Sequence, residues 1–211
     1  MQDLLEAIYL YAEDHSKAPD PLLLELERTT HLKTLAPRML SGHLQGNLLT
    51  MLSQIKRPSY ILEIGTFTGY SALCLAKGLV PGGKLITIEY DPEHAEIASE
   101  AVSVSGFADI ITMMVGDAKK IIPQLDGFFD LVFIDADKEG YSQYFDLIID
   151  KCKAGALILA DNVLWSGKVL DENKDKKTQH IHDFNLKIMN DSRVENVILP
   201  FRDGINMMVK K

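Results

Sequence analysis

The chain has 211 residues, of which 46% are apolar and 25% charged, a balance typical of a globular protein that buries a full core. Its formal net charge of -8 argues against a broad electrostatic surface for nucleic acid or anionic membrane, although a small basic patch stays compatible with it. No apolar run approaches the ~20 residues of a membrane span, and the first residues lack the basic start of a signal peptide. We therefore expect one cytoplasmic domain, with Cys74 and Cys152 as buried free thiols.

The N-terminal quarter of the chain predicts helices only. Apolar residues recur at helical spacing over 2–15, and Pro19 and Pro21 break that pattern. Further helices are expected over 22–33 and 45–55. We interpret residues 1–56 as a helical segment that caps a site or forms a subunit interface, and residues 57–211 as the core of the same domain.

From Tyr60 onward, predicted strands and helices alternate. This alternation predicts an α/β fold, a parallel sheet with helices on both faces, whereas the short turn before the last strand requires that final pair to be antiparallel. An irregular loop is expected over 163–175. The expected strands are 60–64, 84–89, 109–115, 129–134, 155–160, 194–199 and 205–209, and the expected helices are 70–80, 92–105, 118–125, 140–150 and 177–190.

The stretch 59–71 combines a buried strand, a glycine turn and the start of a helix. Glycines at Gly65 and Gly69 let the backbone approach a ligand closely. The spacing Glu-x-Gly-x-x-x-Gly differs from the pattern that binds a dinucleotide pyrophosphate. A carboxylate at Glu63 repels phosphate and suits a cationic ligand such as S-adenosylmethionine, although this pattern alone also occurs in simple turns.

Ligands of open α/β sheets bind beyond the carboxyl ends of the strands. The second strand ends in Glu89, which suits ribose hydroxyls, and Ala118 follows the third, where an adenine would lie. The fourth strand leads to Asp135 and the fifth to Asp161 and Asn162. If these strands are neighbours, the three side chains converge as oxygen ligands for Mg²⁺ or Ca²⁺ rather than zinc.

Each of these residues also has an ordinary structural interpretation. Glu89 alone is a solvated strand end, and the Asp161-Asn162 pair alone is turn chemistry. Lys138 alone is a surface lysine, but near a metal it suits a general base. Trp165 either stacks on a flat substrate ring or packs its own loop. Their combination in the right strand order is what indicates a catalytic site.

Three motifs resemble those of the metal-dependent class I O-methyltransferases of the caffeoyl-CoA and catechol type. The match extends from about Met39 to the end of the chain. The resemblance implies a Rossmann-like class I methyltransferase fold with seven strands in the order 3-2-1-4-5-7-6, and commonly a homodimer. The motifs occupy residues 62–71 (LEIGTFTGYS), 133–138 (FIDADK) and 161–167 (DNVLWSG).

The resemblance also implies a role for each matching position. Lys138 would be the catalytic base beside Asp135, and Trp165 would border the acceptor. The metal ligands would be Asp135, Asp161 and Asn162. The donor pocket would be lined by Met39, Ser41, Glu63, Gly65, Phe67, Ser71, Glu89, Ala118, Asp135, Asp137 and Tyr144.

We therefore predict an O-methyltransferase that uses S-adenosylmethionine and a divalent cation, Mg²⁺ first and Ca²⁺ or Mn²⁺ as alternatives. Its acceptor would be a phenolic vicinal diol, with coenzyme A esters an open possibility. The alternative is a transfer RNA 5-hydroxyuridine O-methyltransferase of the same fold. A non-catalytic donor-binding module would not need the three oxygen ligands, and a nicotinamide dehydrogenase disagrees with the glycine spacing.

Overall fold

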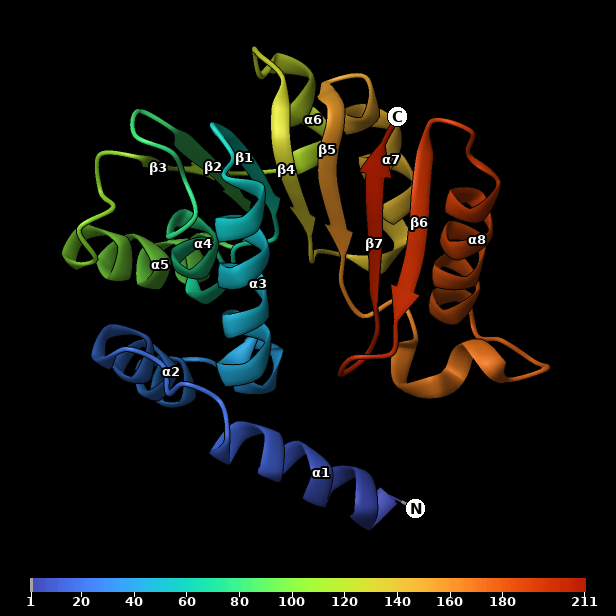
Figure 1. The fold of residues 1–211 in the computed structure, drawn as a ribbon, viewed down its shortest axis with the longest axis horizontal. Coiled ribbons are helices and arrows are strands. Elements are labelled where there is room, and N and C mark those ends of the chain that lie inside the picture. Colours follow the sequence, from blue (N-terminus) through green and yellow to red (C-terminus); the bar gives the residue numbers. More distant parts are fainter. Residues whose placement is uncertain (1) are drawn as a thin grey trace.

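The computed structural model describes residues 2–211, leaving Met1 outside, and arranges seven strands in one sheet in the predicted order β3-β2-β1-β4-β5-β7-β6 (Figure 1). Neighbouring strands are parallel except that β7 runs antiparallel to both β5 and β6, as expected from the short final turn. The strands are β1 (Tyr60–Ile64), β2 (Lys84–Glu89), β3 (Ile111–Val115), β4 (Phe129–Ile134), β5 (Cys152–Ala160), β6 (Val194–Leu199) and β7 (Ile205–Lys210).

Helices cover both faces of the sheet. Apolar side chains of α2, α3, α4 and α5 join one buried cluster, and those of α6, α7 and α8 join the other. The helices are α1 (Gln2–Asp14), α2 (Pro21–Lys33), α3 (Gly42–Lys56), α4 (Tyr70–Ala76), α5 (Pro92–Val104), α6 (Ala118–Ile121), α7 (Tyr141–Ile149) and α8 (Lys176–Asn190), with 3-10 turns η1 (Pro37–Met39), η2 (Ile122–Gln124), η3 (Lys138–Gly140) and η4 (Trp165–Leu170).

Three helices begin at an aspartate whose side chain caps the first turn. The Asp91 side chain accepts a hydrogen bond from the amide of Glu93, with Pro92 in the first turn. Asp20 and Asp175 cap α2 and α8 in the same way. These caps explain why the predicted starts of α2, α5 and α8 agree with the structure to within one residue.

Other boundaries differ from the prediction. Helix α4 ends at Ala76 rather than near residue 80. Gly78 follows it and passes so close to α3 that a Cβ there would lie 2.2 Å from Ser53. Helix α3 begins at Gly42 rather than at residue 45, strand β5 begins three residues early at Cys152, and β3 begins two residues late at Ile111. The expected irregular loop contains η4, which is interrupted by two residues in left-handed conformations.

The register of the sheet aligns the strand ends that matter for a site. Ile64 at the end of β1 pairs with Ile88 on one side and Ile134 on the other, and Ile134 pairs in turn with Ala160. The residues that follow these strands therefore share one edge of the sheet. Figure 1 shows β4 and β5 ending on the side where η4 and the β6–β7 turn lie.

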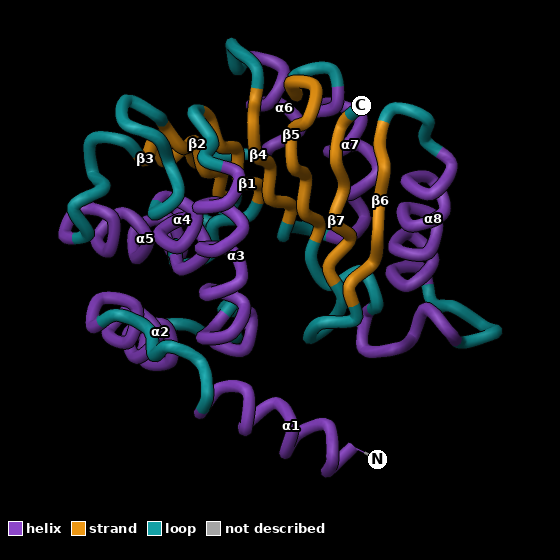
Figure 2. The backbone as a smooth tube through the Cα atoms, in the orientation of Figure 1, coloured by secondary structure: helices purple, strands orange, loops and turns teal. Residues whose placement is uncertain are grey.

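Helix α1 extends away from the sheet (Figure 2), and its residues Ile8 and Tyr11 are exposed. Within the part of the chain that the structure describes, no helix is long and apolar enough to cross a membrane. Cys74 and Cys152 are buried and free, as the sequence predicted.

Candidate active site

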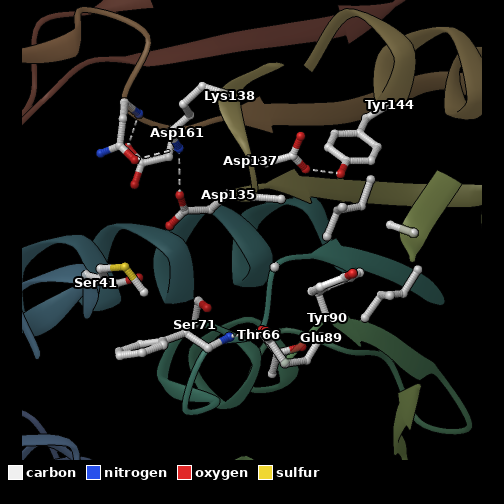
Figure 3. A pocket seen from close by; sticks show the side chains of 18 of the residues that line it. Ser41, Thr66, Ser71, Glu89, Tyr90, Asp135, Asp137, Lys138, Tyr144 and Asp161 are labelled. Carbon is white, nitrogen blue, oxygen red and sulfur yellow. Dashed lines mark hydrogen bonds and ion pairs between the residues drawn. The ribbon is translucent and has the colours of Figure 1, made fainter. Parts of the chain in front are cut away.

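A cavity of about 1460 Å³ lies at this edge of the sheet. Figure 3 shows Ser71, Thr66 and Glu89 on one side of it and Lys138 and Asp135 on the other. Every predicted site residue except Glu63 lines this one cavity. Those residues are Met39, Ser41, Gly65, Phe67, Ser71, Glu89, Ala118, Asp135, Asp137, Lys138, Tyr144, Asp161, Asn162 and Trp165.

Gly65 joins the two sides of the cavity. Its φ of +95° lies in the left-handed region, and a Cβ there would come within 2.0 Å of the carbonyl oxygen of Asp135. Only glycine therefore lets the turn after β1 pass this close to the turn after β4. This contact brings the donor motif and the candidate metal motif together.

Backbone amides fix the carboxylate of Glu89, which is 8% exposed. Its Oε2 accepts a hydrogen bond of 2.6 Å from the amide of Phe67, and its Oε1 accepts one of 2.9 Å from the amide of Asp91. The His94 ring packs edge-on against Phe67, with 4.7 Å between ring centroids. Each carboxylate oxygen keeps a further lone pair for a ligand hydroxyl.

Glu63 lies beneath the cavity instead of on its wall. The side chain is fully buried, Thr87 donates a hydrogen bond to its Oε2, and its Oε1 has no partner in the described part of the chain. Burial, helped by the negative charges of Asp135 and Glu89, raises the pKa of Glu63 to about 8. At neutral pH this group is therefore mostly an uncharged acid, which differs from the charged ligand contact that the sequence predicted.

On the opposite side of the cavity, two side-chain oxygen atoms contact the Nζ of Lys138. The Nζ of Lys138 lies 3.0 Å from Oδ1 of Asp135 and 2.8 Å from Oδ1 of Asn162. Asn162 adopts a φ of +56°, a left-handed conformation that asparagine tolerates better than most residues. This turn directs its amide oxygen toward the end of β4.

Asp161 is buried beside this pair and uses both carboxylate oxygens. Oδ1 accepts a hydrogen bond of 2.8 Å from the amide of Asn162, and Oδ2 accepts one of 2.6 Å from the side chain of Gln45. Burial and the nearby charge of Asp135 raise the pKa of Asp161 to about 6. The Asp161 carboxylate is therefore held by two hydrogen bonds at the wall of the cavity.

Tyr144 donates a hydrogen bond to Asp137, which also lies 3.5 Å from the Nζ of Lys119. All three residues line the cavity, and Figure 3 shows Asp137 and Tyr144 on the same side of it as Lys138. Trp165 lines the cavity and also packs against the buried cluster of α6, α7 and α8. The packing interpretation of Trp165 is therefore confirmed, and stacking on a substrate ring stays a prediction.

Sequence reasoning missed several residues of this site. Tyr141, three residues after Lys138, accepts a hydrogen bond from that lysine and donates one of 2.9 Å to the carbonyl of Asp161. The helical spacing of Lys138 and Tyr141 was a usable signal. Gln45 and Arg202 carried no such signal, because they contact the site from distant parts of the chain.

The residues present fit both groups that the sequence predicted. The fixed carboxylate of Glu89, which lines the cavity, offers acceptor oxygens to a donor with hydroxyl groups. The ammonium of Lys138 stands where a divalent cation would meet Asp135 and Asn162. Among the described residues no group of three or more His, Cys, Asp or Glu side chains gathers at one point, so any such metal site depends on the amide oxygen.

A family model described as O-methyltransferase matches residues 13–211. The chain is 41% identical over 160 residues to a catechol O-methyltransferase of Niastella koreensis, covering 74% of this chain and 72% of that protein. It is 35% identical over 175 residues to caffeoyl-CoA O-methyltransferase 1 of Eucalyptus globulus, covering 77% and 71% of the two chains.

Solved structures agree with these sequence matches. The O-methyltransferase from Bacillus cereus in complex with SAH has a TM-score of 0.91 at 32% identity, with 97% of each chain covered. TomG from Streptomyces achromogenes, in complex with SAM, has a TM-score of 0.91 at 30% identity, with 97% of this chain and 96% of that chain covered. The chain therefore belongs to the O-methyltransferase family, together with relatives named catechol and caffeoyl-CoA O-methyltransferases, as its three motifs predicted.

Proposed function

We propose that this protein transfers a methyl group from S-adenosylmethionine to one hydroxyl of a phenolic vicinal diol, with the help of a divalent cation. The observation that carries this proposal is that the side-chain oxygens of Asp135 and Asn162 both contact the Nζ of Lys138, in the same cavity as the Glu89 carboxylate. Structures similar to this chain were solved with SAM and SAH, which supports the choice of donor.

The donor would supply a methyl group on a positively charged sulfur. Glu89 would accept its ribose hydroxyls, and the turn at Gly65 would let its amino-acid part approach the backbone. Met39, Ser41 and Tyr144 line the same cavity and would complete the pocket. The acidic groups of this region favour a cationic donor over a phosphate-bearing one.

A divalent cation would be held by Asp135, Asp161 and Asn162. It would supply a Lewis acid that makes loss of the acceptor's hydroxyl proton easier. Hard oxygen ligands favour Mg²⁺, with Ca²⁺ or Mn²⁺ as alternatives.

The neutral amine form of Lys138 would accept the proton of the acceptor hydroxyl, whose oxygen would form the new bond to the methyl carbon as the bond to sulfur breaks. Tyr141, Asp135 and Asn162 hold the Lys138 amine at this place. Trp165 would border the flat ring of the acceptor and exclude water from it. Positioning of the two reactants would carry much of the rate acceleration.

Methylation of catechol and of caffeate by the purified protein, with and without EDTA, tests this proposal. We expect turnover that EDTA abolishes and added Mg²⁺ restores. Turnover unaffected by EDTA would remove the metal from the mechanism. Methylation of bulk transfer RNA from a strain that lacks this protein, without turnover of catechol or caffeate, would favour a transfer RNA 5-hydroxyuridine O-methyltransferase instead.

We also propose that the protein is a homodimer in the cytoplasm. Exposed apolar residues on α1, among them Ile8 and Tyr11, support a subunit interface there. The buried free thiols of Cys74 and Cys152 support a reducing compartment. Light scattering on the purified chain tests the first point, and a mass equal to one chain would contradict it.

A further inference from the structure

We propose that Gln45 is a positioning residue for Asp161, and that Arg202 fixes the side-chain amide of Gln45 in the orientation this task requires. The inference rests on the proposed metal-dependent function. Gln45 lies on α3, Asp161 follows β5, and Arg202 lies in the turn between β6 and β7. Three segments far apart in the sequence are therefore linked through the side chain of Gln45.

The chemistry of the partners leaves one orientation for the Gln45 amide. The guanidinium of Arg202 only donates hydrogen bonds, and it lies 2.8 Å from the Oε1 of Gln45. An ionised Asp161 only accepts them, and its Oδ2 lies 2.6 Å from the Nε2 of Gln45. A flipped amide would place two acceptors together and two donors together.

Arg202 is itself held in place. Its guanidinium donates to the backbone carbonyl of Ser41, next to the start of α3, and lies 3.4 Å from that of Leu40. Gln45 is 1% exposed, so a lost partner at this site would not be replaced by bulk water. The hydrogen-bonded series Arg202–Gln45–Asp161 is therefore held at one end by backbone carbonyls that contact Arg202 and at the other by the backbone amide of Asn162.

This arrangement determines which way the Asp161 carboxylate can turn. The backbone amide of Asn162 donates to Oδ1 of Asp161, and the side-chain amide of Gln45 donates to Oδ2. Rotation of the carboxylate would therefore break at least one hydrogen bond. When a group that hydrogen-bonds a metal-binding side chain is removed, metal affinity commonly falls about 10- to 100-fold. Gln45 thus acts on the metal through Asp161 and has no direct part in methyl transfer.

The test compares Gln45→Met with wild type by calorimetric titration of the full chain with Mn²⁺ alone. Methionine keeps the approximate shape of glutamine but cannot donate a hydrogen bond. We expect the dissociation constant for Mn²⁺ to rise about tenfold or more. The affinity for S-adenosylhomocysteine should stay within about twofold, and saturating Mn²⁺ should restore most of kcat, which loss of general structure would not allow.

Two further variants make the outcome decisive. Gln45→Asn keeps an amide that is too short to span both contacts, and should weaken Mn²⁺ binding as well. Gln54→Met, on the exposed part of the same helix, should leave it unchanged. Equal Mn²⁺ affinity in Gln45→Met, Gln45→Asn and wild type would overturn the positioning role, as would equal losses of Mn²⁺ and S-adenosylhomocysteine affinity. Absence of Mn²⁺ binding by the wild-type protein would instead overturn the proposed metal function.

Discussion

The two sides of the cavity are built in different ways. Around Glu89 the backbone sets the geometry, since amides of Phe67 and Asp91 hold the carboxylate and Gly65 shapes the turn. Around Asp161 one backbone amide, that of Asn162, takes part, but most contacts are made by side chains from α3, from the turns after β4 and β5, and from the β6–β7 turn.

This difference has a consequence for ligand binding. The backbone-built side offers its acceptor oxygens without rearrangement, because its hydrogen bonds do not depend on a ligand. On the side-chain-built side, the ammonium of Lys138 already meets the oxygens that a divalent cation would use. A divalent cation bound by these oxygens would compete with the Lys138 contacts, and we expect this side to be the more sensitive to single substitutions.

The largest effect is expected for Asp161→Ala. It removes a proposed metal ligand and leaves the Gln45 amide without an acceptor. We expect kcat/KM for catechol to fall roughly 10³-fold, or about 4 kcal/mol of transition-state stabilisation. The affinity for S-adenosylhomocysteine, measured by calorimetry, should stay near that of wild type. Asp109→Ala, at an exposed position before β3, is the control and should keep wild-type activity. If Asp161→Ala lost S-adenosylhomocysteine affinity as strongly as it lost activity, the two sides of the cavity would not act independently.

Gly65→Ala should damage both sides at once, because this residue lies where they meet. A Cβ at Gly65 would clash with the Asp135 carbonyl in addition to the left-handed φ. We expect the free energy of unfolding to fall by about 3 kcal/mol or more, measured by urea denaturation. Gly106→Ala isolates the cost of the conformation, since Gly106 also has a positive φ but no atom within 4 Å of its Cβ position. Equal losses in the two variants would argue against the close approach.

Glu89→Gln should affect the backbone-built side alone. The amide cannot accept hydrogen bonds from Phe67 and Asp91 as the carboxylate does, and it loses the charge. We expect the dissociation constant for S-adenosylhomocysteine to rise about 10- to 100-fold, equivalent to roughly 1.5–3 kcal/mol. Mn²⁺ binding should be unchanged. Glu96→Gln on the exposed face of α5 is the matched control, and unchanged donor affinity in Glu89→Gln would remove Glu89 from the donor site.

A last effect, spread over several pH units, concerns the pH dependence of stability through Glu63. In the folded protein this acid keeps its proton up to about pH 8, whereas in the unfolded chain it releases the proton near 4.5. Unfolding between these values therefore releases a proton, and stability should fall as pH rises, by up to about 1.4 kcal/mol per pH unit. Glu63→Gln, a neutral isostere, should flatten this dependence in urea titrations from pH 5 to 8. Glu172→Gln in an exposed loop should keep the wild-type slope, and an unaltered slope in Glu63→Gln would mean that Glu63 is ionised in the folded protein.

The sequence by itself determined the elements, the strand order through its motifs, and most of the cavity wall. Periodicity and capping are local properties, so α5 could be bounded from Asp91 and Pro92 alone. The strand-end rule likewise placed Glu89, Asp135 and Asn162 at one edge, because parallel strands end on the same side.

Only the tertiary structure decided the burial of Glu63 and the network that holds Asp161. Glu63 was expected on the cavity wall, but its carboxyl lies beneath the cavity and carries a proton, because solvation depends on packing across the whole sheet. Gln45 and Arg202 lie 116 residues before and 41 residues after Asp161 in the chain, or 157 residues apart. No local pattern joins them, since their contact arises only when α3 and the β6–β7 turn pack against the end of β5.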